Sequence, residues 1–221
     1  MPPPKNQITK PKVHIYLLSK LAFADVTDWR KIMRDLRQGR RGMYWSYKPL
    51  REGAYRMAAE ENPDVRAIYS DVASLAEKAG GDRCRIANVA ALKTFEKKFL
   101  DGITSVRSNF MQGAEQPVEF GEVELVGGPH FSILDADGIE RYVYLHPSNW
   151  KGEEVNAFCE LLTVVVEKRR QASARDVWFL DLRLGQKVPW NSSKKLVRRK
   201  CEQAAEFLVA FQAANLPEEE A

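Results

Sequence analysis

The hydrophobic repeat of this chain changes near its midpoint. Before Gly113 the apolar residues recur at the 3.6-residue interval of an amphipathic helix, whereas after Pro117 they alternate as in a strand with one buried face. Two repeats in successive blocks argue against an all-helical or an all-β architecture. We therefore expect an α+β fold, in which a helical N-terminal module is followed by an α/β sandwich.

The first block predicts four helices, which cover about residues 29–36, 50–61, 64–79 and 86–110. The pair Gly80-Gly81 closes the third of them. Residues 13–17 fit either a short strand or the first turns of a helix, and both readings stay open.

The second block predicts strands at about 120–125, 130–134, 141–146, 177–184 and 187–190, with helices at 151–170 and from Ser192 or Ser193 onward. Asp135-Ala136-Asp137-Gly138 predicts a tight hairpin turn, because Asp-Gly tolerates positive φ. With the helix at 86–110 the order is helix, three strands, helix, strand, strand, helix. We expect a flexible basic tail (1–12), a helical basic module (13–85), the α/β module (86–215) and an acidic tail (216–221).

Residues 128–135 (GPHFSILD) and 142–146 (YVYLH), together with this order of elements over about residues 86–184, resemble the PD-(D/E)xK nuclease superfamily. In active members of that family an Asp on the second strand, and an acidic residue and a Lys two positions apart on the third, bind Mg²⁺ and activate water. The matching third-strand positions here hold Tyr144 and His146. The resemblance therefore implies either a different register or a nuclease-like module that does not cleave.

Charge divides the chain in the same way as the hydrophobic repeat. The net charge of +4 combines 21 basic and 13 acidic residues at 1–115 with 13 basic and 17 acidic residues at 116–221. Nine basic and two acidic side chains fall within residues 30–56, interleaved with aromatic rings. Single-stranded nucleic-acid sites combine cations with stacking rings. The predicted nucleic-acid-binding residues are Arg34, Arg37, Arg40, Arg41, Tyr44, Trp45, Tyr47, Lys48 and Arg51.

The same segment has a structural alternative, in which the cations form the solvated face of one helix and the rings pack inside. A second basic run, Lys194 to Lys200, begins the last predicted helix, and there the solvated face is the preferred interpretation.

A catalytic alternative rests on the hairpin carboxylates. A divergent Mg²⁺-dependent nuclease would use Asp135, Asp137 and Glu140, with His130 or His146 as the proton carrier. The Asp-Ala-Asp-Gly sequence is equally typical of an ordinary tight turn. Mg²⁺ is expected only under this alternative, and otherwise no cofactor or metal is predicted.

We expect a nucleic-acid-binding protein, with DNA favoured over RNA, in which a degenerate nuclease-like module acts as a scaffold and offers a surface to a protein partner. A protein–protein adaptor without nucleic acid is the remaining alternative. The N-terminus lacks the apolar core of a secretory signal, and three cysteines without paired spacing indicate no disulfide framework. These features predict a cytoplasmic location and no membrane association.

Overall fold

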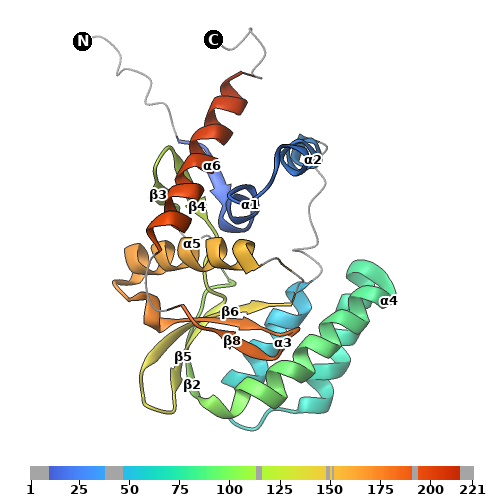
Figure 1. The fold of residues 1–221 in the computed structure, drawn as a ribbon. Helices are drawn as coiled ribbons and strands as arrows, with labels where there is room; N and C mark the ends of the chain where they lie inside the picture. The colour runs from blue at the N-terminus through green and yellow to red at the C-terminus, as the bar shows by residue number, and fades with distance from the viewer. Residues whose placement is uncertain are drawn as a thin grey trace, which may run out of the picture.

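A five-stranded mixed sheet organises the computed structural model, which describes residues 10–37, 47–112, 116–147, 150, 152–190 and 194–214. The order is β2-β5-β6-β7-β8, and only the β6–β7 pair is parallel (Figure 1). The strands are β2 (Ile103–Asn109), β5 (Phe131–Asp135), β6 (Glu140–His146), β7 (Val177–Asp181) and β8 (Gln186–Val188). Parallel neighbours need a crossover, which α5 (Gly152–Arg170) supplies. The α+β class predicted from the sequence is confirmed.

Both faces of this sheet are buried, because its central strands carry apolar residues at odd and at even positions. On β6, Val143 and Leu145 point into a core shared with α3 (Lys48–Ala59) and α4 (Val65–Phe99). Tyr142 and Tyr144 point into a second core on the face covered by α5. The sheet is therefore the middle layer of the molecule, with a separate core on each side (Figure 1).

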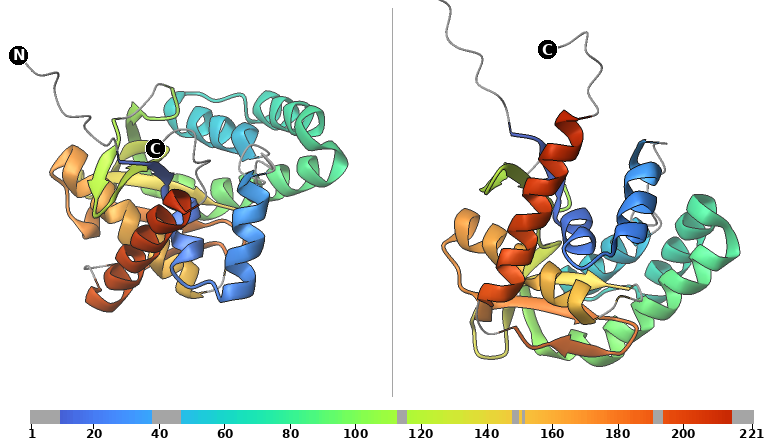
Figure 2. Two further views of the ribbon diagram at one scale, coloured as in Figure 1. Left: turned by 90° about the horizontal axis from the view of Figure 1, so that it is seen from above. Right: turned by 45° about the horizontal axis from the view of Figure 1, so that its top comes forward.

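Beyond α5 lies a further layer, built from both ends of the chain. Helices α1 (Ile15–Leu21) and α6 (Lys195–Ala213) pack on α5, next to a small sheet of order β1-β4-β3. Its strands are β1 (Lys12–His14), β3 (Val118–Phe120) and β4 (Val123–Val126). Helix α2 (Val26–Arg37) follows α1, and α2 and α6 flank α1 (Figure 2).

On the opposite face, α4 is divided into two arms at Gly80 and Gly81. Gly81 has a φ of 69°, a conformation that favours glycine. Buried Asn88, on the second arm, accepts a hydrogen bond from the Leu50 N–H (3.0 Å) and donates one to the Cys84 carbonyl (2.8 Å). Leu50 lies in the first turn of α3, whose N–H groups have no intrahelical acceptor. Asn88 therefore fixes the start of α3 against α4.

One helix prediction is wrong at its C-terminal end. The helix expected over 86–110 ends at Phe99, and after the 3₁₀ turn η2 (Leu100–Gly102) the chain forms the edge strand β2. β-Branched Ile103, Thr104 and Val106 favour a strand, and they gain ladder hydrogen bonds with β5 that a continued helix would forgo. The helical spacing up to Ile103 concealed this change.

The first predicted strand, 120–125, is also placed differently from the expected sandwich. It divides into β3 and β4, and β4 pairs with β3 and with β1 rather than with the five-stranded sheet. The expected order of a helix followed by three strands is present in the main sheet, but the three strands are β2, β5 and β6. The parallel pairing of Val13 with Leu125 joins segments more than 100 residues apart, which no local repeat can reveal.

The other predicted elements are present near their expected positions. Residues 13–17 contain both of the open alternatives, since β1 ends at His14 and α1 begins at Ile15. The 135–138 turn forms as expected, with Gly138 at a φ of 73°. The expected boundary at 85 and 86 falls within the second arm of α4. In the part of the chain that the structure describes, no helix combines the length and the apolar character needed to cross a bilayer.

The Asn88 contact generates a stability prediction. Asn88→Ala should lower the free energy of unfolding by roughly 2–3 kcal/mol, because the buried Leu50 N–H loses its acceptor. Urea denaturation followed by circular dichroism measures this loss. The exposed Asn62→Ala should change stability by less than about 0.5 kcal/mol. Equal small effects of both substitutions would contradict the assigned role of Asn88.

Candidate functional site

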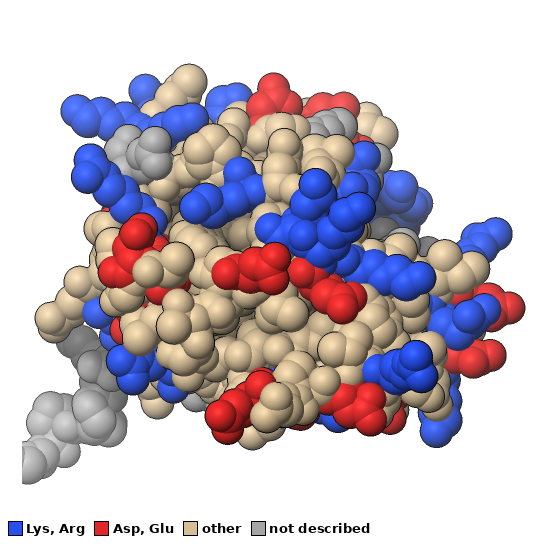
Figure 3. Space-filling model, turned by 90° about the horizontal axis from the view of Figure 1, so that it is seen from below, with Lys and Arg blue, Asp and Glu red and all other residues tan. Residues whose placement is uncertain are grey.

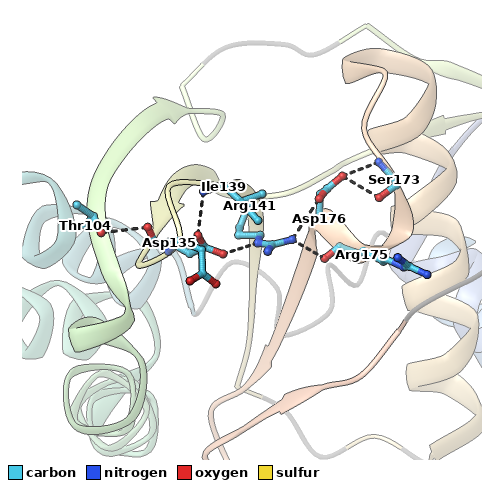
Figure 4. Close-up of polar contacts among 8 residues, drawn as sticks. Thr104, Asp135, Ile139, Arg141, Ser173, Arg175 and Asp176 are labelled. Atoms are coloured by element: carbon cyan, nitrogen blue, oxygen red, sulfur yellow. Dashed lines mark hydrogen bonds and ion pairs between the residues drawn. The ribbon is translucent and has the colours of Figure 1, made fainter.

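The carboxylates considered for catalysis surround the hairpin between β5 and β6. Asp135 is buried, and its Oδ1 accepts hydrogen bonds from the N–H groups of Asp137 and Ile139. Its Oδ2 accepts from Nε of Arg141 at 2.7 Å (Figure 4). Nη1 of Arg141 also donates hydrogen bonds to Oδ1 of Asp176 (3.2 Å) and to the Arg175 carbonyl (3.0 Å). This network ties the hairpin to the turn that precedes β7.

The electrostatics of Asp135 agree with a structural role. Burial alone would raise the pKa of this carboxyl, but the hydrogen bond from Arg141 and those from the two backbone N–H groups outweigh burial and lower the pKa. Both of its oxygens are engaged, while Asp137 and Glu140 are exposed. Within the described ranges, no group of three or more His, Cys, Asp or Glu residues is arranged to hold a metal ion.

The two histidines of the catalytic alternative lie at the other end of the same strands. His130 directly precedes β5 and His146 ends β6, so roughly 16 Å of strand separates His130 from Asp135 at about 3.3 Å per residue. The structure therefore does not bring His130 and His146 together with Asp135, Asp137 and Glu140. It divides the five residues between two ends of the sheet.

The histidine end forms a buried aromatic cluster. The imidazole of His130 stacks on Tyr144 with centroids 4.4 Å apart, and His146 contacts Phe179 and Trp150. Nδ1 of His130 accepts a hydrogen bond from the Leu145 N–H (3.1 Å), which places the proton of the neutral ring on Nε2. Burial, followed by the charge of Arg51, holds the pKa of His130 well below its usual range.

His14, the third histidine, reaches the same region from the β1–α1 junction. Its Nδ1 accepts a hydrogen bond from the Tyr16 N–H (3.1 Å), which caps α1. Burial and then the Arg51 charge lower the pKa of His14 to about 4. All three histidines of the chain thus interact electrostatically with one another or with Arg51. Positions 14, 130 and 146 show no common spacing, so no local sequence pattern indicates this convergence.

The predicted nucleic-acid-binding residues are spread over several elements. Arg34 is exposed on α2, and Arg37 ends that helix, although its side chain lies outside the described part. Tyr47 is half-buried before α3, Lys48 begins α3 beside Glu52 (3.5 Å), and Arg51 faces the histidine cluster. The remaining predicted residues, Arg40, Arg41, Tyr44 and Trp45, fall outside the described residues.

A groove between α2 and α6 brings the two basic runs of the sequence together. It has a volume of about 810 Å³, with the end of α1 between its two walls (Figure 2). Arg30 and Arg34 line the α2 wall and Lys200 lines the α6 wall. These cations stand above an apolar lining that includes Trp29, Met33, Phe207 and Phe211.

The rings in this groove are accessible. Phe207 is 55% exposed and meets Trp29 edge-on, with centroids 4.7 Å apart. Nε1 of Trp29 donates to the Leu21 carbonyl (3.1 Å), which fixes the indole in the wall. Among the described lining residues Asp25 is the only acidic one, and it caps α2 by accepting a hydrogen bond from the Asp28 N–H. By contrast, basic and acidic side chains are interspersed on the face seen from below in Figure 3.

The residues predicted to bind nucleic acid do not include the second wall of the groove. The preferred interpretation of Lys194 to Lys200 was a solvated face, and Phe207 was not among the predicted site residues. Lys200, Gln203, Phe207 and Phe211 recur at intervals of three and four, so they form a second, amphipathic stripe beside the buried one. An exposed Phe in register with a Lys is the signal that would have identified it.

The hairpin network predicts a large effect on stability. Arg141→Met should lower the free energy of unfolding by about 3–5 kcal/mol, because it leaves the buried Asp135 carboxylate without its cation. Arg107→Met, at an exposed position on β2, should change it by less than about 0.5 kcal/mol. Chemical denaturation at pH 7 compares the two variants, and similar stabilities would contradict the assignment.

The low pKa of His14 predicts a pH dependence. The unfolded chain protonates His14 near pH 6.5 and the folded chain only near pH 4. Neutral His14 therefore contributes fully to the free energy of unfolding above pH 6.5, and this contribution is lost as the pH falls toward 4. His14→Asn keeps a capping acceptor and does not titrate. Between pH 7 and pH 4 the variant should lose about 3 kcal/mol less stability than the parent. Parallel stability curves from urea denaturation would contradict this prediction.

Three comparisons with known proteins, against family models, curated proteins and solved structures, found no match to this chain.

Proposed function

We propose that this protein binds single-stranded nucleic acid in the groove between α2 and α6. One observation carries the proposal: cations from two distant basic runs face each other across a groove lined with accessible rings. Cations follow a phosphate backbone, and flat rings stack with bases whatever the sequence. A solvated helix face would not need the cations and the rings on the same side.

This proposal differs from the sequence prediction in where the interface lies. The predicted site used residues 34–51 alone, within a helical module separate from the scaffold. The groove combines Arg30 and Arg34 of α2 with Lys200 and Phe207 of α6, so the C-terminal helix contributes directly to binding. The exposed ring of Phe207 favours single strands, because the bases of a duplex are already stacked on one another.

Fluorescence anisotropy with a labelled 4-nucleotide oligothymidylate, titrated over a salt series, tests the proposal. Three lining cations predict a slope of about −2 for the logarithm of the association constant against the logarithm of salt concentration, at about −0.7 per phosphate contact. Arg30→Gln/Arg34→Gln should reduce the slope to about −0.7 and weaken binding at least about tenfold at low salt. The matched control is Arg66→Gln/Lys93→Gln on exposed positions of α4, which should leave both values unchanged.

The stacking component has its own test. Phe207→Ser should weaken binding by about 1–3 kcal/mol, roughly 5- to 150-fold, if one base stacks on this ring. Leu196→Ser is the control, since Leu196 is 70% exposed on the same helix but does not line the groove. Anisotropy with the same oligonucleotide measures both variants.

Two outcomes would overturn the proposal. Salt-insensitive binding, or no binding at low salt, would remove nucleic acid as the ligand. Equal affinity for polyglutamate, with the same sensitivity to Arg30→Gln/Arg34→Gln, would favour the adaptor alternative, in which the groove receives an acidic protein segment.

A further inference from the structure

Aromatic and basic side chains continue beyond the groove along the first helix. Lys200, in the α6 wall, places Nζ 4.4 Å from the ring centroid of Phe23, which follows the end of α1. Within α1, Nζ of Lys20 in the last turn lies 4.9 Å from the centroid of the Tyr16 ring in the first turn. Each of these four side chains is half-buried, so each keeps an accessible edge.

This series of rings and cations extends from Tyr16 to the histidine cluster. The Tyr16 ring lies 5.0 Å from that of Trp150, and Trp150 lies 4.4 Å from His146. Tyr16 and Lys20 are four residues apart, on one face of α1, and Phe23 comes about one further turn along. Rings and cations thus follow each other from the groove to the ends of β5 and β6.

We propose that a bound single strand leaves the groove along this face of α1 and passes Phe23, Lys20 and Tyr16 to end at Trp150. This inference rests on the proposed function and extends it from a short pocket to a track for a longer strand. Tyr16 lies five residues before the end of α1, roughly 8 Å along the helix at 1.5 Å per residue, and Phe23 follows two residues beyond that end, which leaves room for more than about two stacked nucleotides at 3.4 Å each. Lys20 lies between the two rings, where a phosphate of such a strand would pass.

The rings of the track pack against the core and still keep accessible surface. The fully buried positions of α1 are Ile15, Leu18, Ser19 and Leu21, whereas Tyr16 and Phe23 are only half-buried against the core. The track also begins at a residue that already lines the groove, Lys200, so a strand needs no gap to pass from one to the other.

Chain length separates the track from the groove in an experiment. Tyr16→Leu/Lys20→Gln keeps apolar bulk at position 16 but removes the ring and the charge. We expect this variant to weaken binding of a 12-nucleotide oligothymidylate at least about tenfold, through the loss of one stacked base and one phosphate contact. Binding of a 4-nucleotide oligomer, which fits within the groove, should change by less than about twofold. For the parent protein the salt slope of the 12-mer should be steeper than that of the 4-mer by about 0.7.

Photocrosslinking of the parent protein provides a readout that does not depend on a variant. A 12-mer with a single 5-iodouracil near one end should form adducts on Tyr16 or Trp150 in at least one of the two end placements. A 4-mer with the same group should form adducts only on groove residues such as Trp29 or Phe207. Thermal unfolding confirms that Tyr16→Leu/Lys20→Gln is folded.

The outcomes separate this inference from the proposed function. If Arg30→Gln/Arg34→Gln weakens both oligomers while Tyr16→Leu/Lys20→Gln leaves the 12-mer unchanged, the groove binds nucleic acid and the track is wrong. Adducts confined to the groove with the 12-mer would lead to the same conclusion. If neither oligomer binds the parent protein, both proposals are overturned.

Discussion

The parallel pairing of β6 with β7 is the constraint on which the rest of this structure depends. It requires a crossover, and the crossover helix α5 is buried without interruption from Ala157 to Val166. A helix buried on all sides needs cover on the side away from the sheet, and α1, α6 and the small sheet provide it. The buried Glu160 of α5 also holds α6 in place, because its Oε2 accepts a hydrogen bond from the Lys194 N–H at the start of α6 (3.2 Å). This cover over α5 also positions the α6 wall of the groove.

The two ends of the central strands solve the burial of polar groups in different ways. At the hairpin, charge is retained and neutralised, because Asp135, Arg141 and Asp176 satisfy one another. At the opposite end, charge is suppressed, because burial and the nearby Arg51 keep the imidazoles of His14 and His130 neutral. The third-strand positions of the nuclease resemblance, Tyr144 and His146, lie at this second end, where His146 is in register with the buried Asp181 of β7.

Sequence patterns predicted most of the elements and little of their assembly. Local signals were sufficient for the 135–138 turn, for α5 and for the break at Gly80-Gly81, because each depends on residues close in sequence. They failed at β2, where helical spacing continued to Ile103 and only Gly102 and the following β-branched residues marked a change. They could not predict the β1–β4 pairing or the meeting of α2 with α6, because those contacts join segments more than 100 residues apart. Of the residues predicted to bind nucleic acid, Arg34 is the one that the described groove lining contains, and the α6 wall was not predicted.

The composition of the groove also has a consequence for when the protein can act. Its described lining comes from residues 21–34 and from residues 200–211. During synthesis the first wall leaves the ribosome long before the second, and α1 and α6 meet only over a completed α5. If the groove binds nucleic acid as proposed, a chain truncated before α6 would keep the α2 cations and lose the site.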